Sequence, residues 1–236
     1  MKNFLYVQNL VLRSNFFSYK FRLSQTAYKL GYFLTFLTLL RLWCATQFGL
    51  GVDEAHYVLY GQLLDWSYFD HPPLVGWTQW LFSLLPILEL LQARLAPILI
   101  SLVSSILTFN YLKKHSHSEI NAAYGVALMN LTPIYNALSI ALLPDTLLIP
   151  LTILIINKTE DILNNPNYKN WILLGTYLGF AGLSKYTAIL YVIALIIIFI
   201  LFRKITELLK LKLWAGVSIA FALVFPVSAV AQAPAP

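Results

Sequence analysis

The sequence predicts an all-α protein that crosses a membrane several times. Of its 236 residues, 59% are apolar and only 11% are charged, and the mean hydropathy is +0.71. Soluble domains carry about 25% charged residues, and a soluble chain of this size could not keep so much apolar surface away from water. The same composition excludes a disordered chain. The apolar residues form long runs, which favours membrane helices over a barrel.

Seven of these runs are expected to form membrane helices. They lie at 28–49, 93–112, 120–137, 146–157, 171–184, 186–202 and 213–230. Several are shorter than the roughly 20 residues of an average span, a length that suits helices packed inside a bundle. The runs divide the chain into an N-terminal segment (1–27), a transmembrane domain (28–230, with a first outer loop at 50–92) and a tail (231–236).

The basic residues predict which side of the membrane each loop faces. All but three of the 16 Lys and Arg precede the first run or lie in the loops after the second, fourth and sixth runs. Cytoplasmic loops are rich in Lys and Arg, so we expect a multi-pass protein of the cell inner (cytoplasmic) membrane with a cytoplasmic N-terminus. The exceptions are Arg41, Arg94 and Lys185, within or at the outer end of a run. Loop topology thus explains the net charge of +6, and nucleic acid binding is not expected.

The first outer loop carries most of the ionisable residues outside the basic loops. It holds five acids and two histidines but no Lys or Arg. Its Tyr and Trp residues favour the headgroup level of a membrane, and two amphipathic surface helices are expected near 53–64 and 73–88. Asp53 and Tyr57 fall at helical spacing, so they can share one face of the first helix.

Asp53 and Glu54 directly follow the first apolar run. They could be a solvated loop pair, but ionisable groups at membrane depth are costly and are more often functional. The only cysteine, Cys44, excludes a disulfide framework within the chain and a cysteine-based zinc site.

Several short motifs, taken in order, resemble the GT-C glycosyltransferases. The motifs are Asp53-Glu54 with Tyr57, Asp65-Trp66-x-Tyr68-Phe69-Asp70-His71-Pro72-Pro73-Leu74, Arg94-Leu95-x-Pro97, Leu143-Pro144-Asp145 and Gly182-Leu183-Ser184-Lys185-Tyr186. They are most similar to the branch that contains protein O-mannosyltransferases and lipid A aminoarabinose transferases. The resemblance covers about residues 30–190. It implies the N-terminal half of a GT-C fold and inverting transfer of a sugar from a polyprenyl-phosphate donor to an extracytoplasmic acceptor.

The resemblance also implies roles for four residues. Asp53 matches the first-loop acid and is the expected general base, while its neighbour Glu54 would orient the loop or a substrate hydroxyl. Lys185 would bind the donor phosphate as a compact cation, which we favour over a lysine that only snorkels to water. Arg94 would either clamp a phosphate or pair with Glu89 or a first-loop acid to fix the fold.

Asp70, His71, Tyr57 and Asp145 are expected to support the site. Histidine departs from the lysine that relatives often carry at position 71. An Asp-His pair could hold a divalent cation, but adjacent residues are poor joint ligands, so Asp70 and His71 could instead hydrogen-bond the loop. Asp145 could hold the first loop or a metal, or could cap the following helix. No other cofactor is expected.

Relatives are about twice as long as this chain, so a truncated, inactive assembly partner is one alternative function. A transporter or flippase component for lipid-linked sugars is the other, although its ionisable residues would line a path through the bilayer. The expected partners are a polyprenyl-phosphate-linked sugar, a lipid, glycan or protein acceptor, and membrane lipids.

Overall fold

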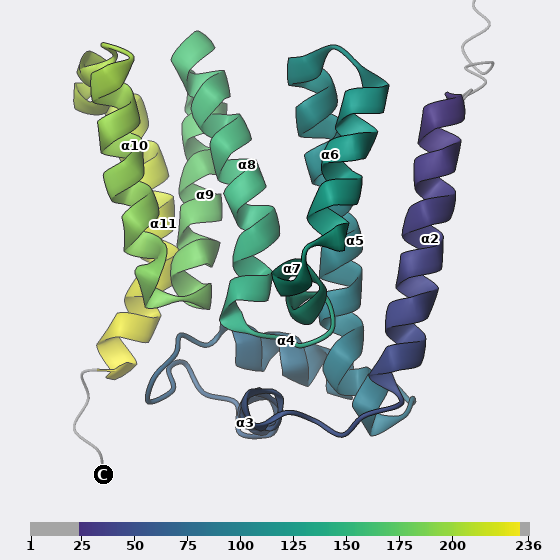
Figure 1. The fold of residues 1–236 in the computed structure, drawn as a ribbon. Helices are drawn as coiled ribbons and strands as arrows, with labels where there is room; N and C mark the ends of the chain where they lie inside the picture. Colours follow the sequence, from purple (N-terminus) through teal and green to yellow (C-terminus); the bar gives the residue numbers. More distant parts are fainter. Residues whose placement is uncertain (1–23, 232–236) are drawn as a thin grey trace, which may run out of the picture.

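The computed structural model describes residues 24–231, with side chains up to Val227. This part of the chain contains ten α-helices, two 3-10 helices and no strand (Figure 1). In order they are α2 (Gln25–Ala45), α3 (Val52–Gln62), α4 (Leu74–Ser83), α5 (Glu89–Ser116), α6 (Glu119–Leu131), α7 (Pro133–Leu138), α8 (Pro144–Asn164), α9 (Tyr168–Ser184), η1 (Tyr186–Ala188), α10 (Ile189–Leu201), η2 (Ile205–Leu209) and α11 (Leu211–Ala231). The expectation of an all-α protein is confirmed for these residues.

The long helices run side by side, up and down, and α3 and α4 lie across one end of them (Figure 1). We call this end the loop end. The chain also turns there at 139–143 and at 185–188, whereas the connections 116–118, 165–167 and 202–210 lie at the opposite end. Segments far apart in sequence therefore meet at the loop end.

The basic residues gather at the end opposite α3 and α4. Those near its connections or near the start of α2 are Lys29, Lys113, Lys114, Lys158, Lys169, Arg203, Lys204, Lys210 and Lys212. The basic residues before position 24, as well as most of the N-terminal segment 1–27 and of the tail 231–236, lie outside the described residues. The up-and-down helix order thus places the basic loops on one side, as their sequence positions predict.

A helix occupies each of the seven predicted runs. Among the residues that the structure describes, α5 alone is both long and apolar enough to cross a membrane. The segments Tyr186–Leu201 and Leu211–Val227 are apolar but shorter. Seven crossings therefore stay a prediction. The expected run 120–137 is interrupted at Thr132, because Pro133 starts the new helix α7 and cannot donate a backbone N–H to the preceding turn.

The two loop helices are packed onto the bundle by an apolar cluster. Tyr57 and Tyr60 of α3 and Val75 of α4 are buried together with Ala96 of α5 and with Leu142, which precedes α8. Burying one large apolar side chain stabilises a fold by about 1.5–3 kcal/mol. The cluster therefore fixes α3, and the acids at its start, against the ends of α5 and α8.

Arg41 is buried inside the bundle, with 4% of its surface exposed. Its guanidinium donates to Ser101 Oγ at 3.1 Å, and to the side-chain oxygens of Asn130 and Asn136 at 3.0 Å each. It thus joins α2 to α5, α6 and α7 through uncharged partners.

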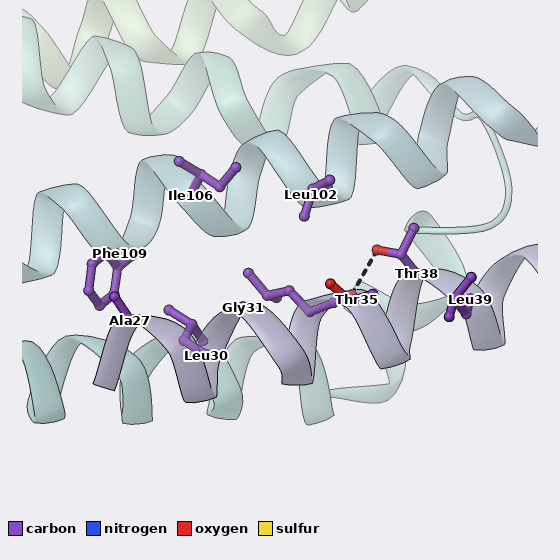
Figure 2. Close-up of a pocket in the computed structure, with 10 residues that line it drawn as sticks. Ala27, Leu30, Gly31, Thr35, Thr38, Leu39, Leu102, Ile106 and Phe109 are labelled. Atoms are coloured by element: carbon purple, nitrogen blue, oxygen red, sulfur yellow. Dashed lines mark hydrogen bonds between the residues drawn. The ribbon is translucent and has the colours of Figure 1, made fainter. Parts of the chain in front are cut away.

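The groove between α2 and α5 is apolar along its length (Figure 2). Leu30 and Leu39 line one wall, Leu102 and Phe109 line the other, and the groove holds about 480 Å³. The hydroxyl of Thr38, at its edge, donates to the backbone oxygen of Leu34 in its own helix, at 2.8 Å. Such a surface suits the hydrocarbon of a membrane.

Candidate functional site

The first turn of α3 separates two neighbouring acids. Glu54 points inward and is buried, whereas Asp53 is exposed. Successive helical residues point about 100° apart, so two adjacent carboxylates take different surroundings. Glu54 also accepts a hydrogen bond from the backbone N–H of Gly51, at 2.8 Å, which holds the start of the helix.

Glu54 forms a two-pronged ion pair with Arg94 of α5. Nε and Nη2 of Arg94 each donate to one carboxylate oxygen, both at 2.8 Å. The other N–H groups of Arg94 donate to the backbone oxygens of Ala45, Phe48 and Gly49, at 2.8–2.9 Å. All five donors of the guanidinium are thus used within the chain. Of the two alternatives for Arg94, the structure has the pairing with a first-loop acid.

A polar network joins α3 to the connection before α4. Tyr60 donates a short hydrogen bond to Asp70 Oδ1, and its hydroxyl lies 2.7 Å from His56 Nε2. The hydroxyl of Tyr57 lies 3.4 Å from His71 Nε2. Nδ1 of His71 lies 2.9 Å from Asp70 Oδ2, within ion-pair distance but without the geometry of a hydrogen bond.

The aromatic rings hold this network in place. The rings of Tyr60 and Tyr68 stack with centroids 3.7 Å apart, and the Tyr68 hydroxyl donates to the Tyr60 backbone oxygen at 2.7 Å. A Cβ at position 76 would lie 2.5 Å from the Tyr68 hydroxyl, so glycine is needed there. Tyr60, Tyr68 and His56 were not predicted as site residues from the sequence. The four-residue spacing of His56 and Tyr60 on a helix is the signal that could have paired them.

The charges of three acids act on the phenol of Tyr57. Burial raises its pKa to about 12, and the negative charges of Asp70, Asp53 and Asp145 add to the rise. These acids come from the connection before α4, from α3 and from α8. We call Asp53, Asp70 and Asp145 the carboxylate cluster. The fold thus brings three of the predicted site acids to one phenol.

Lys185 follows the last residue of α9 and contacts the same cluster. Its Nζ lies 2.9 Å and 2.8 Å from the two carboxylate oxygens of Asp145. The lysine side chain is 30% exposed and the aspartate side chain 48%. The alternative of Asp145 as a helix cap is wrong, because α8 begins at Pro144 and Leu143 is the cap, which puts Asp145 in the first turn. Proline suits that first position, since it has no N–H to satisfy.

The residues proposed for a metal do not form a complete ligand set. Among residues 24–231, no three side chains of His, Cys, Asp or Glu lie close enough together to hold a metal ion. Asp70 and His71 contact each other, and Asp70 also accepts from Tyr60. A metal would need more ligands than these two supply.

The comparison with known families supplies the general chemistry. The model of the dolichyl-phosphate-mannose-protein mannosyltransferase family matches residues 70–229. The chain belongs to this family. It is therefore a mannosyltransferase-like glycosyltransferase in general terms. No curated protein matches the chain, and no solved structure does.

The range matched to the mannosyltransferase family contains most of the site. Asp70, His71, Arg94, Asp145 and Lys185 lie inside it. The acids Asp53 and Glu54 and the phenol of Tyr57 precede it and join the site only through the fold.

Proposed function

We propose that the protein transfers a sugar from a polyprenyl-phosphate carrier to an acceptor outside the cytoplasm. One observation carries this proposal: the charges of Asp53, Asp70 and Asp145 all act on Tyr57, and Lys185 pairs with Asp145. Transfer of a glycosyl group from a phosphate needs a carboxylate to take a proton and a cation to stabilise the departing phosphate. The loop end supplies the carboxylates of the cluster and, paired with one of them, the ammonium of Lys185.

Asp53 is the carboxylate best placed to act as the general base. Glu54 is bound to Arg94, Asp70 accepts from Tyr60, and Asp145 pairs with Lys185. Asp53 is exposed, and its carboxylate forms no hydrogen bond or ion pair within the described part of the chain. Its oxygens are therefore free to accept the proton of an acceptor hydroxyl.

The proposed reaction is a single inverting displacement. The acceptor oxygen attacks the anomeric carbon of the donor sugar and its proton passes to Asp53. The bond between that carbon and the phosphate oxygen breaks, and the lipid phosphate leaves with the bonding electrons. Lys185 offsets the added charge on the phosphate. Its pair with Asp145 is part-exposed, and such pairs contribute only about 0–1 kcal/mol, so the ammonium can turn to a phosphate at little cost.

The proposed location follows from the two ends of the bundle. The basic connections lie opposite α3 and α4, and the positive-inside rule assigns such connections to the cytoplasm. The carboxylate cluster would then lie outside the cytoplasm, where carrier lipid and acceptor meet in the inner membrane.

The test is transfer by the purified full-length protein in liposomes containing a radiolabelled polyprenyl-phosphate sugar. We expect Asp53→Asn to lower product formation at least 100-fold, since general-base catalysis contributes about 10²–10⁴-fold. The matched control is Asp65→Asn, because Asp65 is an exposed acid of the same loop outside the cluster. We expect it to keep normal transfer.

Three results would overturn the proposal. Full activity of Asp53→Asn would remove Asp53 as the base. Movement of the lipid-linked sugar across the bilayer without any product would favour a transporter. Absence of both transfer and movement in the unaltered protein, with normal folding, would favour an inactive assembly partner.

A further inference from the structure

Besides the groove between α2 and α5, a second cavity, with a polar lining, lies at the loop end between α3, α4 and α5. It holds about 210 Å³. Half of its ten lining residues carry a polar side chain: Gln62, Gln79, Ser83, Glu89 and Gln92. The groove between α2 and α5, in contrast, is lined by apolar side chains with only two threonines. The second cavity therefore offers hydrogen bonds where a lipid-facing groove does not.

This cavity is separate from the carboxylate cluster. Val58 and Gln62 of α3 line it, whereas Tyr57 and Tyr60 face the polar network. At about 100° per residue, Gln62 points roughly 140° away from Tyr57 around the helix axis. The body of α3 thus stands between the two sites, and none of the residues assigned to sugar transfer lines the cavity.

Two amide side chains in the cavity each use one N–H within the chain and leave the carbonyl oxygen unbonded. Gln79 has 4% of its surface exposed, and its side-chain N–H donates to the Ala93 backbone oxygen at 3.1 Å. Gln92 likewise donates to the Leu85 backbone oxygen at 2.7 Å. The side-chain oxygens of both residues form no hydrogen bond within the described residues. Neither oxygen is sealed inside the protein, so both are accessible to a ligand that donates a hydrogen bond to them.

The charge of the cavity narrows the class of ligand. Glu89 forms no hydrogen bond or ion pair with any part of the chain that the structure describes, and no Lys, Arg or His lines the cavity. A phosphate would meet an uncompensated carboxylate there and would be repelled. Gln62, also without a described partner, adds one amide that can donate and accept.

We propose that this cavity binds a neutral sugar ring. A sugar presents several hydroxyl groups, each able to donate to the free oxygens of Gln79, Gln92 and Glu89 and to accept from Gln62. The volume of about 210 Å³ is below the range of about 300–1,000 Å³ typical of drug-sized ligands, which favours a single ring. The proposal concerns binding alone and stands whether or not the carboxylate cluster performs transfer.

The test is saturation-transfer difference NMR on the purified full-length protein in lipid nanodiscs, with methyl α-mannopyranoside as the probe. We expect saturable binding, weakened about 3–10-fold by Gln62→Ala and at least as much by Glu89→Gln, as the loss of single hydrogen bonds implies. Both side chains are exposed, so neither change should disturb folding. The matched control, Gln47→Ala, removes an exposed amide outside the cavity and should leave binding unchanged.

A charged sugar and a variant of the carboxylate cluster test the proposal further. Mannose 1-phosphate should bind more weakly than the neutral sugar, and Glu89→Gln should narrow that difference. Asp53→Asn should leave binding of the neutral sugar unchanged. The proposal would be overturned if no saturable binding is found. It would also be overturned if both cavity variants bind the neutral sugar as well as the unaltered protein does, or if Asp53→Asn alone weakens binding. The last result would place the sugar at the carboxylate cluster and would leave the transfer proposal standing.

Discussion

Arg94 holds Glu54 by two hydrogen bonds of 2.8 Å each, although 40 residues separate them in the chain. The same guanidinium binds three backbone oxygens in the segment that leaves α2. One side chain of α5 thus fixes both the entry into the loop and the first turn of α3. Asp53, which directly precedes Glu54, is positioned by this anchor rather than by a side-chain hydrogen bond of its own.

Removal of this anchor should destabilise the protein. We expect Arg94→Met to lower stability by about 3–5 kcal/mol, because it leaves the buried Glu54 carboxylate without a partner. The measurement is the thermal unfolding temperature in detergent. Glu89→Gln, a change at an unpaired acid in the first turn of the same helix, is the control and should leave it unchanged. An unaltered unfolding temperature for Arg94→Met would mean that the pair does not anchor the loop.

Substitutions in the Lys185–Asp145 pair should destabilise the protein less than Arg94→Met does, because this pair is part-exposed. We expect Lys185→Gln to change stability by less than about 1 kcal/mol while lowering transfer at least tenfold, mainly through a lower kcat, because the cation acts on the charge that develops as the phosphate leaves. The exchanged pair, Asp145→Lys with Lys185→Asp, should restore stability but not transfer. Normal transfer by Lys185→Gln would leave snorkelling as the role of this lysine.

The first outer loop should lose stability at acid pH, when Asp70 becomes protonated. Burial opposes ionisation of Asp70, but the hydrogen bond from Tyr60 and the close contact with His71 outweigh it and hold the pKa of Asp70 below the ordinary value of 3.8. The stabilisation is therefore complete above that value and is lost as the pH falls through the lowered pKa. Unfolding temperatures of the wild type and Asp70→Asn should converge in that acid range.

Tyr60→Phe is the matched variant for this titration. It removes one hydrogen bond to the Asp70 carboxylate, so it should raise the pKa of Asp70 and move the convergence to higher pH. Curves for the wild type and Tyr60→Phe that converge with Asp70→Asn at the same pH would contradict the role of this bond.

Two glycines in membrane-type helices should respond in opposite directions to a methyl group. A Cβ at Gly175 would lie 2.1 Å from the backbone oxygen of Gly216, across the contact of α9 with α11. We expect Gly175→Ala to destabilise the protein by about 1–3 kcal/mol through overpacking. Gly31 in α2 has no atom within 4 Å of such a Cβ, so Gly31→Ala should stabilise it by about 0.5–1 kcal/mol. Changes in unfolding temperature of the same sign for the two variants would refute the close contact of Gly175 with Gly216.

The proposed orientation can be tested with single cysteines. Replacing Cys44, the one native cysteine, by serine gives a background for Asp65→Cys at the loop end and Leu209→Cys in the exposed basic connection. A membrane-impermeant maleimide should label position 65 in intact cells and position 209 only after permeabilisation. The reverse pattern would place the carboxylate cluster in the cytoplasm and would exclude an extracytoplasmic reaction.

The helices and their polarity could be predicted from the sequence because the signals are local. An apolar run favours a helix wherever it lies, and the basic residues between runs assign the loops to sides. Each predicted run contains a helix, and the expected surface helices near 53–64 and 73–88 correspond to α3 and α4. The interruption before Pro133 was missed because apolarity alone does not show where a helix is broken.

The partners of the site residues were decided by the tertiary structure alone. The sequence shows two adjacent acids, but only the packing of α3 on α5 turns Glu54 toward Arg94 and leaves Asp53 exposed. The amides that line the second cavity come from three helices, with no spacing that would connect them. Hydropathy and helix breakers act through near neighbours along the chain, whereas ion pairs and cavities depend on distances in space, which only the folded bundle sets.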